Sequence, residues 1–207
     1  MGLLKLLMSD PAAFLLLVIP LLYSVVIHEV AHGWVAKWMG DPTAKWMGRL
    51  SLNPVKHLDP IGTLMLFIAG FGWAKPVPVN PNNFSDRRKG LILVSSAGIL
   101  ANILMAFGAL LVHRLFDLPP LGMAAVIVYT VAHINITLAA LNLIPIPPLD
   151  GSKILMGFAP AETRYLLARL EPYGFFIIVG LLFLGLLHPF ISFLRGLIIG
   201  LLKIILP

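Results

Sequence analysis

The sequence contains no cysteine and few charged residues. Without cysteine, both a disulfide framework and a thiolate metal site are excluded, and thiols give no sign of the redox compartment. Charged side chains make up only 12% of the 207 residues, hydrophobic ones make up 59%, and the mean hydropathy is +0.95. This composition excludes an ordinary soluble globular protein and is typical of polytopic membrane proteins. Because apolar runs occupy most of the chain, we expect one membrane-embedded domain over residues 1–207.

The net charge of +6 does not indicate a nucleic-acid partner, because the Lys and Arg residues stand in short loops beside apolar runs. The N-terminal run also lacks the small-residue cleavage site of a removable signal peptide. We therefore expect this run to stay in the mature protein, and membrane lipid rather than nucleic acid to surround the chain.

The apolar runs predict an all-α polytopic protein with about five to six membrane helices. Three full spans are expected over residues 11–36, 90–112 and 121–144. The first would measure roughly 39 Å as a helix, which is enough to cross a bilayer with some tilt. The C-terminal part, residues 173–206, is broken at "HPF" and adds one or two further membrane helices. The catalytic core is expected within about residues 11–152.

Between the first two spans, the sequence predicts a segment that does not cross the membrane. The run "IGTLMLFIAGFGW" (61–73) has about a dozen residues, too few to cross as a helix, so we interpret it as re-entrant or interfacial. The following "AKPVPVNPNNF" (74–84) alternates valine with proline, which suits an edge strand or an extended loop.

The distribution of Lys and Arg predicts the orientation. Residues 37–89 carry eight of them and residues 153–169 carry three, whereas the turn near Arg114 and the N-terminal tail carry one each. The positive-inside rule then places the two basic segments in the cytoplasm and the N-terminus outside. We expect an integral protein of a prokaryotic cell (inner) membrane.

Two histidines and a glutamate interrupt the first span, in "SVVIHEVAHGWVAKW" (24–38). His28 and His32 are four residues apart, so they share one face of a helix and can bind one metal ion. Glu29 stands beside them, within reach of a metal-bound water. This is the HExxH arrangement of zinc metallopeptidases, in which zinc lowers the pKa of its water to about 7 and the glutamate removes the proton. The alternative is a helix whose polar residues face a neighbour, but ionisable groups in a membrane are costly and usually functional.

A catalytic zinc normally has a third protein ligand, for which the sequence offers two main candidates. His133 lies deep in the third span. Asp150 lies in "NLIPIPPLDG" (142–151), where prolines break the end of that span. Irregular backbone at membrane depth is tolerated only where it is buried in protein or lines a cavity. The predicted topology puts Asp150 and the histidine motif in the same cytoplasmic half, although spacing alone favours a solvated or helix-capping aspartate.

The pairing of "HEVAH" with "NLIPIPPLDG" resembles the site-2 protease family of intramembrane zinc metallopeptidases, whose second motif has the form NxxPxPxLDG. The flanking "GDPTAK", "LNPVKHLDPIGT" and "KPVPVNPNNF" are similar to the bacterial and archaeal branch that lacks PDZ and CBS domains. The resemblance implies one zinc ion per chain, bound by His28, His32 and Asp150. It further implies that Glu29 is the general base.

The resemblance also implies roles for other residues. Asn142 matches the family asparagine that helps to hold the substrate or stabilises the oxyanion, and securing the broken helix end is an equal alternative. The segment "SAGILAN" matches a small-residue motif of the family through Gly98 and Asn102, and we expect Gly98 to allow close helix packing. His133 points roughly opposite to Asn142 on a helix, which favours a packing or hydrogen-bonding role.

The predicted function is an intramembrane zinc endopeptidase that hydrolyses peptide bonds in or near transmembrane segments of membrane-anchored proteins. A substrate helix has to unwind, because a helix hides its amides in hydrogen bonds. The "KPVPVN" segment is a candidate to hold the unwound substrate by strand addition, with a loop at the interface as the alternative. The rival functions are a membrane metal transporter or metal-binding protein with the same His and Asp cluster, and a catalytically silent scaffold.

Overall fold

The computed structural model describes residues 3–70, 72–120 and 122–206. Within these residues the chain is almost entirely helical, and five helical segments are long and apolar enough to cross a membrane. These segments are Pro11–Trp38, Arg87–Leu115, Met123–Asn142, Ala161–Phe183 and His188–Ile205. The predicted all-helical membrane fold is therefore confirmed, and the C-terminal part supplies two of the five segments.

The longest connection between two α-helices is the one from α4 to α5, which contains the extended segment. The α-helices are α1 (Leu3–Ser9), α2 (Pro11–Trp38), α3 (Thr43–Trp46), α4 (Pro60–Ala69), α5 (Arg87–Leu115), α6 (Met123–Asn142), α7 (Asp150–Phe158), α8 (Ala161–Leu170), α9 (Gly174–Phe183) and α10 (His188–Ile205). Three short 3₁₀ turns connect them: η1 (Pro54–His57), η2 (Pro81–Asn83) and η3 (Glu171–Tyr173).

The sequence marks the ends of the long helices. Asp10 caps α2 by accepting a hydrogen bond from the Ala13 amide, and Asp86 caps α5 in the same way. The prolines that follow Asn142 end α6, because each removes a backbone donor. The predicted start of the third span, Leu121, lies outside the described residues.

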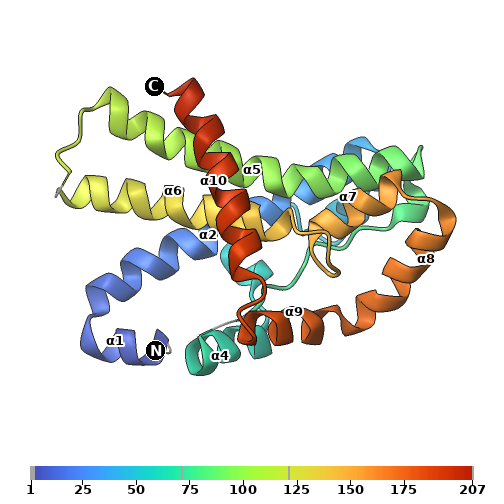
Figure 1. Cartoon of the computed structure of the whole chain (residues 1–207), viewed down its shortest axis with the longest axis horizontal. Coiled ribbons are helices and arrows are strands. Elements are labelled where there is room, and N and C mark those ends of the chain that lie inside the picture. The colour runs from blue at the N-terminus through green and yellow to red at the C-terminus, as the bar shows by residue number, and fades with distance from the viewer. Residues whose placement is uncertain (1–2, 71, 121, 207) are drawn as a thin grey trace.

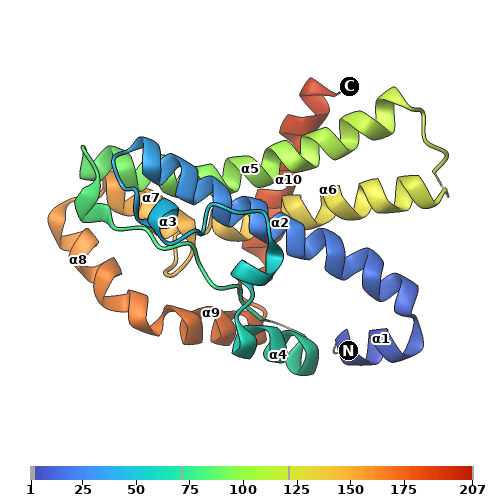
Figure 2. The same cartoon turned by 180° about the vertical axis from the view of Figure 1, so that it is seen from behind.

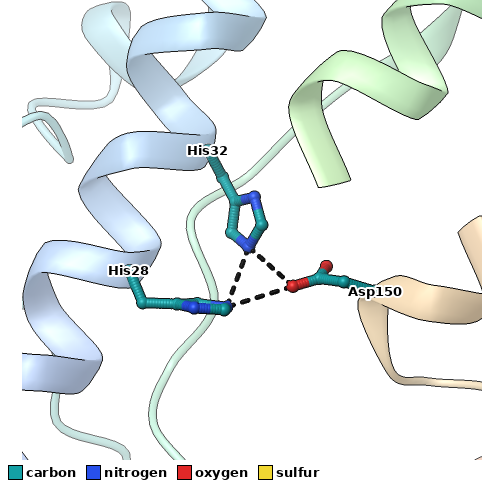
Figure 3. Close-up of side chains that lie close together, drawn as sticks. All are labelled: His28, His32 and Asp150. Atoms are coloured by element: carbon teal, nitrogen blue, oxygen red, sulfur yellow. Dashed lines mark hydrogen bonds and ion pairs between the residues drawn. The ribbon is translucent and has the colours of Figure 1, made fainter. Parts of the chain in front are cut away.

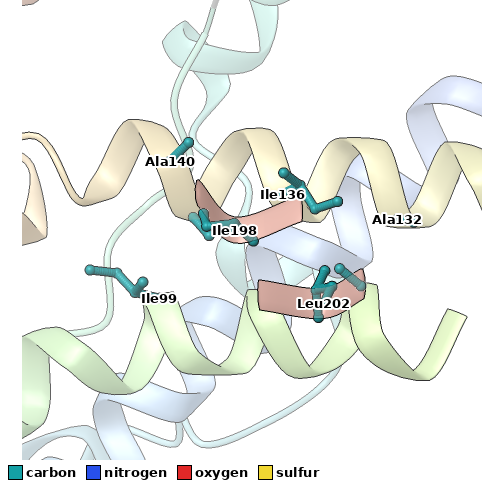
Figure 4. Packing of buried hydrophobic residues seen from close by; sticks show 8 residues of the cluster. Ile99, Ala132, Ile136, Ala140, Ile198 and Leu202 are labelled. Carbon is teal, nitrogen blue, oxygen red and sulfur yellow. The ribbon is translucent and has the colours of Figure 1, made fainter. Parts of the chain in front are cut away.

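Helices α2, α5 and α6 pack side by side along the long axis of the molecule, and α10 crosses α5 and α6 (Figures 1 and 2). A cluster of buried apolar side chains joins α5, α6 and α10 (Figure 4). Its members are Ile99, Ala106, Ala132, Ile136, Ala139, Ala140, Ile198 and Leu202. The alanines let the helix backbones approach closely, as is usual between membrane helices.

Of the two alternatives predicted for residues 74–84, the edge strand is wrong, and the segment forms the extended loop. Among the described residues no strand forms, and the only β feature there is an isolated antiparallel bridge between Leu58 and Ala74. Pro76 and Pro78 have no N–H to donate to a strand ladder, so the segment stays extended without pairing. The preceding apolar run forms α4, whose 10 residues are too few to cross a membrane. Phe71, within that predicted run, lies outside the described residues.

A buried carboxylate fixes the extended segment to the end of α2. Asp41 is fully buried and accepts hydrogen bonds from the Asn80 amide at 2.7 Å, from the Asn83 side chain at 2.8 Å, and from the amide and hydroxyl of Thr43. Burial alone would raise the pKa of Asp41, but these hydrogen bonds lower it below its usual value. The motifs "GDPTAK" and "VNPNNF" thus form one structural unit.

Candidate metal centre

Helix α2 presents two histidines to the interior of the molecule. His28 and His32 are only 7% and 8% exposed, and their Nε2 atoms lie 3.0 Å apart (Figure 3). Their separation of four residues puts one imidazole a turn above the other, as the sequence predicted.

Asp150 reaches the same point from a distant part of the sequence. Its Oδ2 atom lies 3.1 Å from the Nε2 atom of each histidine (Figure 3). Asp150 is the first residue of α7, which begins directly after the proline-rich break. A carboxylate is favoured at a helix N-terminus.

The hydrogen bonds at the two Nδ1 atoms, which face away from the cluster, determine the tautomer of each imidazole. The Nδ1 atom of His28 lies 2.6 Å from Oδ1 of Asn102, and the Nδ1 atom of His32 lies 2.6 Å from the carbonyl oxygen of Val94. Both partners are acceptors, so each Nδ1 carries the hydrogen and each Nε2 presents a lone pair.

Three lone-pair donors therefore converge without a hydrogen between them. No hydrogen-bond donor among the described residues reaches Oδ2 of Asp150, although this atom is buried. Such an arrangement is repulsive unless a cation lies between the three atoms. Their spacing of 3.0–3.1 Å is close to the roughly 3.3 Å edge of a tetrahedral zinc shell. The residues fit a metal ion, and they form the only three-ligand cluster of this kind in the described part of the chain.

The metal centre opens into a cavity of about 910 Å³. Glu29 and Asn142 line this cavity together with the three cluster residues. Oε2 of Glu29 accepts a hydrogen bond of 2.7 Å from the backbone N–H of Val77, which belongs to the extended segment. Glu29 is thus held at the wall of the cavity, beside the histidines.

Asn142 and His133 have different surroundings. Asn142 lines the cavity, but its amide nitrogen donates to the Leu138 carbonyl at 3.0 Å, a contact that also secures the end of α6. His133 lies outside the metal cluster, and its Nδ1 accepts a hydrogen bond from Arg195 at 3.2 Å. Of the two main candidates for the third ligand, the structure thus brings Asp150, and not His133, to the histidine pair.

Comparison with known proteins identifies the family. The model of peptidase family M50 matches residues 117–185, which include Asn142 and Asp150. "Putative zinc metalloprotease YwhC" of Bacillus subtilis is 41% identical over 170 residues, covering 78% of this chain and 77% of that protein. The chain belongs to peptidase family M50. The predicted resemblance to the site-2 proteases and the prediction of a metallopeptidase are thereby confirmed.

Two further relatives have lower sequence identity than YwhC. "Putative zinc metalloprotease Rip2" of Mycolicibacterium smegmatis is 33% identical over 181 residues, covering 84% of this chain and 69% of that protein. "Zinc metalloprotease MJ0392" of Methanocaldococcus jannaschii is 28% identical over 159 residues, and the match spans only 39% of its length. No solved structure matches the chain significantly.

A network of buried polar side chains is hydrogen-bonded to the M50 metal centre through His28. The Asn102 amide donates to Oδ1 of Asn135 at 2.8 Å, and the Asn135 amide donates to Oγ of Ser24 at 2.8 Å. Both asparagines are fully buried. This network links α2, α5 and α6, and it orients the carbonyl that holds His28. The sequence interpretation gave no role to Asn135 or Ser24, although uncharged polar residues inside apolar spans were the available signal.

Gly98 of the M50 chain provides the space for the imidazoles. A Cβ atom at this position would lie 2.5 Å from Cε1 of His28 and 2.5 Å from Nε2 of His32. The predicted close packing at Gly98 is thus between a helix backbone and the proposed ligands themselves.

Residues of the C-terminal part also line the M50 cavity. Trp73 and Phe175 both line the cavity, and their rings meet edge to face with centroids 4.9 Å apart. Helix α9 therefore lines the same cavity as α2, so residues well beyond the two motifs shape the site.

Proposed function

We propose that the chain is an intramembrane zinc endopeptidase that cleaves membrane-anchored proteins. The observation that carries this proposal is the convergence of Nε2 of His28, Nε2 of His32 and Oδ2 of Asp150 within 3.1 Å, each with a lone pair toward the others. Zinc is the metal named for the relatives, and two histidines with one carboxylate are a usual catalytic zinc shell with an open position.

A zinc ion bound by these residues would polarise the scissile carbonyl and lower the pKa of water. In the proposed mechanism Glu29 accepts the proton from the attacking water and passes it to the leaving amine. The Val77 amide supports this role because it holds one carboxylate oxygen and leaves the other for the proton. Asn142, which also lines the cavity, is proposed to contact the substrate or the oxyanion.

The proposed substrates are membrane-anchored proteins, cleaved in or near their transmembrane segments. The cavity supports this assignment because it lies among helices that are apolar enough to cross a membrane. One of its walls is the extended segment around Val77, which is the candidate to bind an unwound substrate by strand addition. We propose that the active site opens toward the cytoplasm, on the basis of the eight Lys and Arg residues in segment 37–89.

The substitution Glu29→Gln tests the mechanism. The variant is expected to keep about one zinc per chain and to lose cleavage of a model transmembrane substrate by a factor on the order of 10²–10⁴. The matched control is Glu162→Gln, at an exposed position on α8 away from the cavity, which should cleave normally.

The outcomes separate the proposal from its alternatives. A Glu29→Gln protein that still cleaves would exclude the general-base role. If both the native chain and the control bind zinc but neither cleaves the substrate, the result would favour a metal-binding or transport function over a peptidase. Comparison of membrane proteomes with native and Glu29→Gln protein should then identify substrates that are trapped uncut.

A further inference from the structure

A second cavity, of about 600 Å³, lies between α5, α6 and α10. It is near the connection from α5 to α6, whereas the metal centre is near α7, toward the other end of the bundle (Figure 1). Its floor is apolar and includes Ala132, Ile136 and Leu202 of the packed cluster (Figure 4).

The rim of this cavity is strongly basic. Arg114, Arg195 and Lys203 line it, and Asp117 is the only acidic residue that does. None of the three cations forms an ion pair with a carboxylate in the described part of the chain. His113 also lines the cavity but shares a 3.0 Å hydrogen bond with the Tyr129 hydroxyl. The cavity thus carries excess positive charge beside an apolar floor.

Arg195 is the residue that most needs a partner. Its guanidinium donates from Nη2 to Nδ1 of His133 at 3.2 Å, so this imidazole nitrogen accepts and cannot carry a proton. The Nε atom of Arg195 is buried and has no hydrogen-bond partner among the described residues. A guanidinium among apolar helices with a free buried donor is costly unless an anion binds it.

We infer that this cavity binds a phosphate group. The planar guanidinium of Arg195 presents several donors to the oxygens of a phosphate, while Lys203 and Arg114 add charge at the rim. The apolar floor suits acyl chains, so the phosphate belongs either to an anionic lipid headgroup or to free phosphate. This site is separate from the metal centre and does not depend on the proposed peptidase mechanism.

Lipid binding by the purified full-length protein tests this inference. Native mass spectrometry and thermal unfolding in neutral detergent would compare dioleoyl-phosphatidylglycerol, dioleoylglycerol without phosphate, and inorganic phosphate. Phosphatidylglycerol should bind and raise the unfolding temperature, whereas dioleoylglycerol should not. An equal rise with inorganic phosphate alone would identify free phosphate as the source.

Two variants assign the effect to the cavity. Arg195→Met should bind phosphatidylglycerol about tenfold more weakly, and Lys203→Met, at an exposed position, about threefold more weakly. Arg169→Met, at an exposed position on α8 outside the cavity, is the matched control and should bind like the native chain. Equal binding of the two lipids, or unchanged affinity in both cavity variants, would overturn the inference.

Discussion

At the scale of single residues, two contacts position each imidazole of the metal centre. One is a hydrogen bond at Nδ1, on the outer side of the ring, and the other is a neighbouring helix backbone that packs against the ring. The outer contacts are the Asn102 side chain for His28 and the Val94 carbonyl for His32. The neighbour is the backbone at Gly98. The motifs predicted the cluster members from sequence, but the contacts of Nδ1 depend on how α5 packs against α2, which a single sequence does not reveal.

Gly98→Ala is expected to abolish metal binding. The added Cβ would lie 2.5 Å from both imidazoles and would push them out of position. Zinc content measured on the purified protein should fall from about one ion per chain to near zero, with loss of cleavage. Gly108→Ala is the control, because it lies in the same helix and its Cβ would meet nothing within 4 Å. Full zinc content in Gly98→Ala would contradict the close contact.

Asn102→Ala should weaken zinc binding without removing a ligand. The loss of the acceptor on Nδ1 releases the His28 ring and its tautomer, an effect worth about 10–100-fold in metal affinity. Competition with a chelator would measure the affinity, and Asn82→Ala, at an exposed position in η2, is the control. An unchanged zinc affinity would show that the Asn102 contact does not orient the ligand.

At the scale of elements, prolines shape two parts of the site, the end of α6 and the extended segment around Val77. The prolines after Asn142 end α6, as the sequence predicted, and α7 then begins at Asp150. The prolines around Val77 suggested an edge strand or an extended loop, and the strand was wrong, because residues 76–79 form no strand. Local composition does not specify which acceptor a backbone N–H will bond. Here the Val77 N–H donates to the Glu29 side chain on α2.

The Asp41 unit should make stability depend on pH. The folded-state pKa of Asp41 is lowered, so its contribution is present above its unfolded pKa of about 3.9 and is lost as the pH falls through the folded value. Asp41→Asn should therefore destabilise the protein by about 1–3 kcal/mol at pH 7. Thermal unfolding in detergent should show this difference shrinking below about pH 4. Glu162→Gln is the control, and a difference that does not change with pH would exclude the ionised carboxylate as the cause.

At the scale of the whole molecule, the hydrophobic runs predicted the spans to within a few residues. The first predicted span, 11–36, became Pro11–Trp38, and the second, 90–112, became Arg87–Leu115. The C-terminal part was harder to predict, because α8 is less apolar than the other segments and joins α9 through η3. Its contribution to the cavity, through Phe175, depends on tertiary packing alone.

The absence of cysteine makes the membrane orientation directly testable. Val55 and Phe116 are 73% and 71% exposed and lie on loops that the charge distribution assigns to opposite sides. In intact cells, a membrane-impermeant maleimide should label Phe116→Cys and should label Val55→Cys only after permeabilisation. The native chain without cysteine is the blank. The reverse pattern would place the metal centre on the outer side.

The hydrogen bond from Val77 to Glu29 has a practical consequence for mapping this site by mutagenesis. The donor is a main-chain amide, so Val77→Ala leaves the bond in place, and an alanine scan would report only the loss of the buried Val77 side chain. Only a change to the peptide bond itself reveals the contact, for example Val77→Pro or an amide-to-ester replacement at residue 77. The proposed base is therefore held by a group that the genetic code can alter in one way alone.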